Sequence, residues 1–261
     1  MELQTLEGRS KRRHIYHAHH ALPDTADGRD RLYRPRAAHW PRELPLQDFL
    51  PHARHIIDQG AEHVCTGVAL AVTANYMLRR HRPYEPLYPV SARMLYEMAR
   101  RYDGVTEPHE GSTARGAIKG WRKHGVCGEE LWPFHEFDTD RALRPDRERD
   151  AKRRPVGAYW RVTKQRVDLL RAAIAEHGVV YVTTKVHEGW HNVGPDGRIP
   201  FRTDGKPGAH AVVLVGYDRH GFWLQNSKGE AWGRGGFGRL SDEDWVMHAQ
   251  DAWVVELPEA R

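Results

Sequence analysis

The spacing of apolar residues changes once along the chain, near Gly178, and this change limits the folds open to the protein. Before it, apolar residues recur with helical spacing, and after it β-branched residues form the short runs typical of strands. Helices and antiparallel strands that are segregated in this way indicate an α+β protein. The chain has 261 residues, enough to bury a sizeable core.

The helical half is predicted to contain a helix that begins at Cys65, a second with Ser91 as its N-cap, and a third that ends at Gly125. A fourth, amphipathic helix is expected over residues 165–177. Strands are expected at residues 179–186, 210–217, 221–225, 237–240 and 253–257. We divide the chain into a basic, Arg-, His- and Pro-rich N-terminal arm (1–44), a mainly helical part (45–150) and a mainly β part (151–261), with a charged connector at 141–155.

Charge and cysteine usage narrow the class of protein. The chain carries a net charge of +5, but it has no zinc-finger, RRM-type or helix-turn-helix motif, so nucleic acid is a disfavoured partner. Its two cysteines exclude a disulfide framework. No apolar run approaches the ~20 residues of a membrane span, and residues 1–21 lack the apolar core of a secretory signal. We expect a cytoplasmic protein, with export by a signal-less route as the alternative.

Cys65 stands where a polar, Gly-containing turn meets an apolar helical run. One face of that helix is predicted to carry Val68, Ala69, Val72, Tyr76 and Met77. A thiol at a helix N-terminus is favoured as the thiolate, the form that attacks carbonyls. Gln59, six residues earlier, can donate its amide to an oxyanion beside the N–H of Cys65. A buried helical cysteine without a chemical role is the alternative interpretation.

A base and an orienting group are available in the β half. His210 opens an apolar strand, and Asn226 follows it by sixteen residues, a spacing over which a hairpin can return the Asn to the His. A cysteine nucleophile needs a base, and the base needs a third group to fix its tautomer. The amide oxygen of an Asn can do this without adding charge.

Cys65, His210 and Asn226, in this order and with Gln59 upstream, resemble the papain family of cysteine peptidases. The resemblance covers about residues 44–257 and includes Leu-Val-Gly-Tyr after the His and Asn-Ser-x-Gly-x-x-Trp-Gly around the Asn. A helix that ends in His-Gly-Val-Cys, followed by Glu-Leu-Trp-Pro, is similar to bacterial members. The resemblance implies a helical left domain and a β-barrel-like right domain with the active-site cleft between them, and no cofactor.

The resemblance also implies a role for each residue. Cys65 is the nucleophile, His210 is the base and later the acid for the leaving amine, and Asn226 orients His210. Gln59 and the Cys65 N–H stabilise the oxyanion.

Further positions correspond to the substrate-binding part of the family. Gly111 and Ser112 match a segment that hydrogen-bonds the substrate backbone, and Trp232 matches an aromatic residue near the His–Asn pair. His63 replaces a Gly beside the scissile bond, where its side chain can narrow the cleft or touch the substrate. Lys228 replaces a Trp that shields the His–Asn bond, and its charge disfavours an imidazolium.

The turn before the nucleophile departs from the family as well. Where the family has Cys-Gly-Ser-Cys-Trp, this chain has residues 62–66, Glu-His-Val-Cys-Thr, so the family disulfide to this turn is absent. No inhibitory pro-segment is visible in the sequence. We therefore expect something other than a long propeptide to restrain an active enzyme.

Three other features are given structural interpretations. Residues 187–191 match H-E-x-x-H, but a β-branched run precedes them, so we expect a loop without zinc, with His187 or Trp190 lining the cleft. Cys127 is expected to be structural. The histidines of the N-terminal arm are expected to belong to a polar segment rather than a metal site; they are His14, His17, His19 and His20.

The leading hypothesis is a cysteine peptidase that cleaves peptide bonds through an acyl-enzyme, with a peptide or protein as substrate. A catalytically weak or inactive module that binds peptides or proteins is one alternative, and a thiol acyltransferase or amidase is another. An inhibitor or immunity-type protein is a candidate partner.

Overall fold

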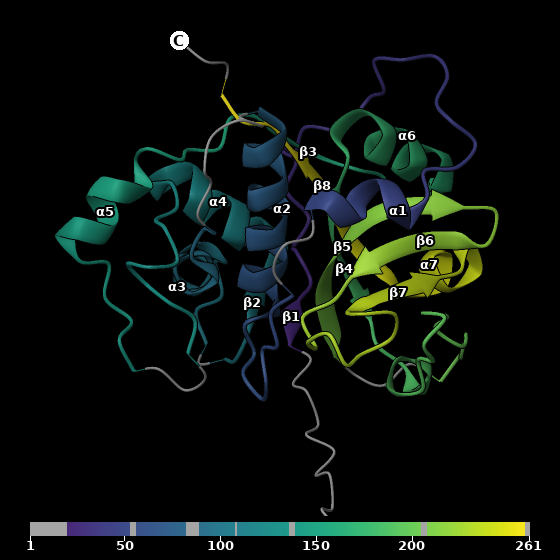
Figure 1. The fold of residues 1–261 in the computed structure, drawn as a ribbon. Helices are drawn as coiled ribbons and strands as arrows, with labels where there is room; N and C mark the ends of the chain where they lie inside the picture. The colour runs from purple at the N-terminus through teal and green to yellow at the C-terminus, as the bar shows by residue number, and fades with distance from the viewer. Residues whose placement is uncertain are drawn as a thin grey trace, which may run out of the picture.

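The computed structural model describes residues 20–52, 56–81, 89–107, 109–135, 139–204 and 208–258. In this part of the chain, one group of helices lies on one side, and a mixed, eight-stranded sheet with the remaining helices lies on the other (Figure 1). The predicted α+β fold is confirmed. The sheet does not close into a barrel, because its outer strands β2 and β3 do not pair with each other.

Helix α2 (Cys65–His81) lies at the centre of the molecule, between the helices of the helical side and the sheet (Figure 1). The buried surface of this helix is wider than the single apolar face predicted from the sequence, because the helix is buried on nearly all sides. Gly67 allows α3 (Ala92–Tyr102) to approach closely: a β-carbon there would stand 2.5 Å from the Ala92 carbonyl oxygen. The elements on the helical side are completed by α4 (Ala114–His124) and α5 (Pro145–Ala151).

The sheet has the strand order β2-β1-β5-β4-β8-β3, and β6 and β7 continue from β5 in a second direction. Only β1 and β2 pair in parallel among the named strands; the other pairs are antiparallel. The strands are β1 (Ala21–Leu22), β2 (Ser112–Thr113), β3 (Tyr159–Arg161), β4 (Val180–Lys185), β5 (Ala209–Asp218), β6 (Gly221–Gln225), β7 (Phe237–Leu240) and β8 (Ala249–Val255).

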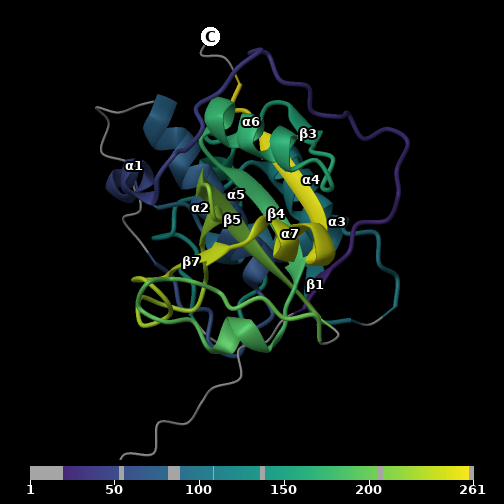
Figure 2. The same cartoon turned by 90° about the vertical axis from the view of Figure 1, so that its right-hand side faces the viewer.

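Strand β5 separates two apolar clusters, because successive side chains of a strand point to opposite faces. Ala211 and Val213 join the cluster around α2, α3 and α4. Val212 and Leu214 join the cluster beneath α6 (Val167–His177) and α7 (Asp242–His248), which lie over the other face (Figure 2). The strand that carries His210 is therefore held from both sides.

Several short elements were not predicted. Helix α5 lies within the predicted connector, and β8 begins four residues before the predicted start of the last strand. Helix α7 and strand β3 were also missed, as were α1 (Leu46–Phe49) and the 3₁₀ turns η1 (Leu50–His52) and η2 (Glu188–His191). None of the described helices is long and apolar enough to cross a bilayer.

The described part of the N-terminal arm, purple in Figure 2, packs against both the sheet and the start of α4. Leu32 bridges to Arg161, and Leu44 bridges to Tyr217. The Asp24 carboxylate accepts hydrogen bonds from the Arg115 backbone and the Trp253 indole, both at 2.9 Å. These contacts place the arm so that β1 enters the sheet.

Candidate active site

The turn that leads to Cys65 is held by a buried ion pair. The Arg93 side chain is fully buried, and its two terminal nitrogens each lie 2.8 Å from a carboxylate oxygen of Glu62. The Glu62 backbone oxygen in turn accepts a 2.7 Å hydrogen bond from Gln59 Nε2. Because α2 begins at Cys65, this turn presents the Gln59 amide and the start of the helix together.

The hairpin formed by β5 and β6 returns Asn226 to His210. His210 Nε2 lies 2.7 Å from Asn226 Oδ1, and both residues are buried. The same amide oxygen accepts a 2.8 Å hydrogen bond from the Ser227 backbone N–H. An amide oxygen only accepts, so this arrangement places the imidazole proton on Nε2.

Ser227 connects this pair to Gln59 and was not predicted as a separate site residue. Its hydroxyl donates to Gln59 Oε1 and lies 3.5 Å from His210 Nε2. The backbones are joined too, since Gln59 N–H donates to the Ser227 oxygen at 2.9 Å. Gln59 from the helical half and the His–Asn pair from the sheet thus belong to one buried hydrogen-bonded group.

Two tryptophans form a wall beside His210. The Trp190 ring stands edge-on to the imidazole, with the centroids 6.2 Å apart. Trp232 stacks on Trp190 at 6.1 Å, and its Nε1 donates to the Trp190 backbone oxygen at 2.9 Å. The expectation that Trp190 lines a cleft is wrong, because η2 tucks its side chain fully out of solvent under Trp232.

The predicted substrate-binding segment is paired with the N-terminal arm. Ser112 contacts the start of α2, because its hydroxyl lies 2.6 Å from that of Thr66. Its strand β2 pairs with β1, with Ala21 opposite Ser112 on one side and opposite Ala209 of β5 on the other. The arm therefore occupies the place that the resemblance assigns to the substrate backbone, between the helices and the sheet (Figure 1).

The thiol of Cys65 is fully buried in this arrangement. Burial raises its pKa to about 11, whereas backbone hydrogen bonds from Ala211, His20 and Thr66 act in the lowering direction. The sequence predicted a lowered pKa from the helix N-terminus alone. That prediction is wrong for the form with β1 in place, because the loss of hydration outweighs the favourable N–H groups.

The structure also shows the contacts of His63 and Lys228, two residues that depart from the family pattern. His63 is half-buried and contacts Glu110 and His20; burial and His20 lower its pKa, although Glu110 acts in the opposite direction. Lys228 is buried, with its backbone bridged to Asp58, and burial lowers the pKa of its ammonium group to about 8. Above about pH 8 the Lys228 side chain is therefore mostly uncharged, and the positive charge expected beside His210 and Asn226 is reduced.

The zinc-like motif is not organised as a zinc site. His187 is buried and caps η2, where its Nε2 lies 2.8 Å from the Asp244 carboxylate, whereas His191 is exposed. His187 therefore does not line a cleft. Cys127 is buried in an apolar cluster with Met94 and Trp132, and burial raises its pKa to about 12.

Comparison with known proteins shows the family and the fold of the chain. The family model of the papain family cysteine proteases matches residues 56–254. Xylellain, a cysteine protease from Xylella fastidiosa, superposes with a TM-score of 0.81 at 28% identity, over 93% of this chain and 97% of that chain. No curated protein matches the chain significantly.

Two more distant structures share the fold. Digestive procathepsin L 3 of the Tenebrio molitor larval midgut has a TM-score of 0.74 at 17% identity, with 93% of this chain and 77% of that chain covered. The bromelain protease from Ananas comosus has a TM-score of 0.60 at 16% identity, with coverages of 84% and 100%. The family match spans most of the chain, and on that basis the protein belongs to the papain family of cysteine proteases.

Proposed function

We propose that the protein hydrolyses peptide bonds through an acyl-enzyme formed on Cys65. In this mechanism His210 removes the thiol proton and later protonates the leaving amine, while Asn226 orients the imidazole. Gln59 and the Cys65 N–H stabilise the oxyanion. The substrate is a peptide or protein, whose backbone pairs with Gly111 and Ser112.

The contact between His210 and Asn226 carries this proposal. Asn226 Oδ1 accepts from Nε2 at 2.7 Å, so Nδ1 is the ring nitrogen that lacks the proton and can take one from a thiol. Because the Ser227 N–H also donates to the same oxygen, the amide cannot flip without losing two hydrogen bonds. This tautomer supports the proposed role of His210 as the general base.

The position of Gln59 supports the oxyanion role. Its amide is oriented from both ends, by Ser227 at Oε1 and by the Glu62 backbone at Nε2. Cys65 is the first residue of a 17-residue helix, and the N–H groups at such an end point toward added negative charge. These donors are fixed before a substrate arrives, which is what electrostatic stabilisation of a transition state requires.

The buried thiol favours a second candidate, a papain-like module without catalytic activity. A substrate can reach Cys65 only if β1 leaves, since Ala21 and Cys65 are 4% and 0% exposed. If β1 never leaves, the raised pKa of the thiol keeps it unreactive near neutral pH. The two candidates therefore differ in what happens once the arm is displaced.

The experiment uses the full chain with Ala21→Glu, since a carboxylate cannot be buried without a partner at that position. Thr25→Glu, which adds the same charge at an exposed residue of the arm, is the control. Quenched fluorescent peptide libraries should be cleaved by the Ala21→Glu protein and not after a further Cys65→Ala change. A folded Ala21→Glu protein that binds peptides without cleaving any would support the inactive module instead.

A further inference from the structure

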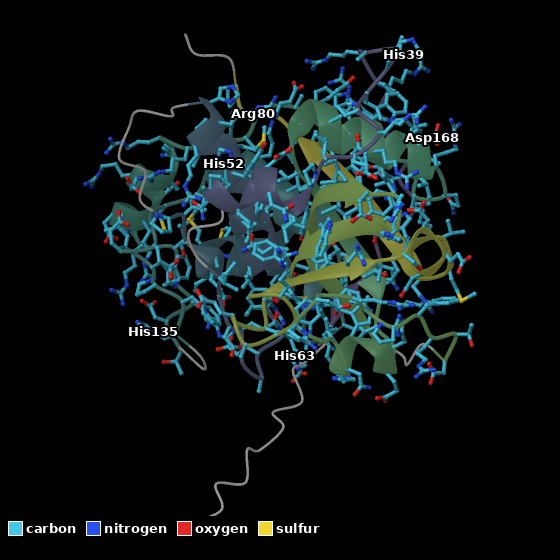
Figure 3. All side chains as sticks on the ribbon, turned by 45° about the vertical axis from the view of Figure 1, so that its right-hand side comes forward. His39, His52, His63, Arg80, His135 and Asp168 are labelled. Atoms are coloured by element: carbon cyan, nitrogen blue, oxygen red, sulfur yellow. The ribbon has the colours of Figure 1, made fainter. Side chains whose placement is uncertain are left out.

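Three potential metal ligands from separate segments meet beside the candidate active site. They are His20 of the N-terminal arm, His63 of the turn before α2, and Glu110 directly before Gly111. One ligand atom from each lies within 4.8 Å of the other two. His63 lies at the lower end of the boundary between helices and sheet in Figure 3, away from His39.

The contacts among the three are already close. His63 Nε2 lies 2.5 Å from a Glu110 carboxylate oxygen, and the rings of His20 and His63 are 4.0 Å apart between centroids. His63 Nδ1 is buried without a hydrogen-bond partner among the described residues, so no second bond fixes the ring. The His63 ring can therefore turn either nitrogen toward the other two ligands.

The backbone positions of the three residues are fixed by contacts that do not involve their own side chains. His20 directly precedes β1, and its carbonyl oxygen packs against Gly111. His63 is two residues before Cys65, in the turn held by Arg93, and Glu110 is two residues before β2. Only the side chains need to move, and those of His20 and Glu110 are exposed enough to do so.

Two imidazoles and one carboxylate match the preference of Zn²⁺. Zinc binds His nitrogen and carboxylate oxygen at about 2.0–2.2 Å, and it accepts three protein ligands with a water in the fourth position. Mg²⁺ and Ca²⁺ prefer oxygen ligands alone, so this donor set disfavours them. The observed separations bracket the spacing of roughly 3.3 Å that these bond lengths give in a tetrahedral site.

A second group of two histidines and one carboxylate can be compared with the group of His20, His63 and Glu110. His187, Asp244 and His248 are also within reach of one ion, but they are buried. The two carboxylate oxygens of Asp244 lie 2.8 Å and 2.9 Å from the two rings, and His187 Nδ1 accepts from the Gly189 N–H. Hydrogen bonds therefore already link all three residues of that group.

We propose that His20, His63 and Glu110 bind Zn²⁺, and that the bound ion clamps the N-terminal arm across Cys65. The arm supplies one ligand and the body supplies two, so the complete site exists only while β1 is in place. An ion that binds only this form shifts the docking equilibrium by a factor of 1 + [Zn²⁺]/Kd, about 100-fold at 100 times Kd. The clamp thereby restrains access to the thiol.

The first test measures metal binding without any catalytic readout. The full chain is titrated with Co²⁺, whose visible absorption reports coordination, and Zn²⁺ is then added in competition. His14, His17 and His19 are replaced by Asn in every sample, so that ions bound there are not counted. One equivalent should bind, and His63→Gln and Glu110→Gln should each weaken binding by at least about tenfold.

Two controls identify the ligands. His39→Asn removes an exposed arm histidine at the opposite end of the molecule and should leave the affinity unchanged (Figure 3). Cys65→Ala removes the nearby thiol and should also leave it unchanged. Loss of binding in Cys65→Ala together with full binding in Glu110→Gln would place the ion on the thiol, and that result or an absence of stoichiometric binding overturns the site.

The second test addresses the clamp. Zn²⁺ at 100 times its Kd should slow iodoacetamide labelling of Cys65 by about 100-fold, and His20→Asn should remove this protection. Binding without protection, or equal protection in His20→Asn, overturns the clamp. Neither test depends on peptide cleavage, so either can fail while the proposed peptidase activity stands, and the reverse is also true.

Discussion

The carbonyl oxygen of His20 packs so closely against Gly111 that a β-carbon on Gly111 would stand 1.7 Å from it. Gly111 also has a φ of +78°, a conformation that side chains disfavour. The segment predicted to receive substrate is thus fitted against the protein's own arm, with no room for a side chain between them.

Gly111→Ala is therefore expected to displace β1 and expose the thiol. Labelling of Cys65 at pH 7 should become at least about tenfold faster, because the clash must be relieved by movement of the arm. Gly104→Ala is the matched control, since Gly104 has a φ of +75° but no atom within 4 Å of its β-carbon position. Equal labelling rates in both variants would mean that backbone strain, and not the arm, controls access.

The pH dependence of Cys65 labelling should change when the arm is displaced. In the full chain, burial holds the thiol pKa at about 11, so labelling should rise only in strongly alkaline solution. In Ala21→Glu the thiol regains water and keeps the helix N-terminus, so its pKa should fall below the ordinary value of about 8.5. Adding His210→Ala should raise it again, whereas indifference to His210 would contradict an ion pair. Cys127→Ser provides the background.

The helices that could be predicted from sequence are those with local signals at their ends. Ser91 accepts the Met94 N–H at 3.0 Å, and Gly125 ends α4 with a φ of +78°. Such caps involve residues at most four apart, so they can be seen in a window of sequence. Helix α5 has only seven residues, most of them charged, and no comparable apolar pattern, so the sequence predicts a connector there.

In the candidate site, too, the residues in local motifs could be predicted from the sequence, whereas the contacts between distant segments could not. Cys65, His210 and Asn226 stand in motifs that can be read directly. The pairing of Ala21 with Ser112 and Ala209 cannot, because a two-residue strand has no periodicity and its partners lie far along the chain. Strand β1 exists only through tertiary pairing, and burial of Cys65 in the assembled fold reverses the expected thiol pKa.

Ser227→Ala should reduce peptide cleavage in the arm-displaced Ala21→Glu background. The change removes the hydroxyl that holds Gln59 Oε1 but leaves the backbone N–H on Asn226. One lost hydrogen bond of about 0.5–1.5 kcal/mol predicts a roughly 2- to 12-fold fall in kcat/KM.

A double-mutant cycle with Gln59→Ala checks the route of this effect. If Ser227 acts through the Gln59 amide, the double variant should be scarcely worse than Gln59→Ala alone. Additive losses would show instead that the serine acts on His210, which its oxygen approaches at 3.5 Å.

Lys228→Met should stabilise the protein at neutral pH. Burial lowers the ammonium pKa from 10.5 to about 8 in the folded state, so between these pH values the unfolded chain binds more protons. The folded state therefore gains stability as pH rises through this window, and below it the buried charge costs up to about 3 kcal/mol. Methionine removes that cost, so the variant should be about 1–3 kcal/mol more stable at pH 7, with the difference vanishing above pH 10.5.

Denaturant unfolding of both proteins at several pH values measures this difference. Lys123→Met is the control, because Lys123 is exposed on α4 and should show no such trend. The opposite result, a Lys228→Met protein less stable at pH 7, would mean that the attraction between Lys228 and Asp58 exceeds the cost of burial. In that case the lysine would stabilise the loop that follows Asn226, and its replacement by Met should also slow peptide cleavage.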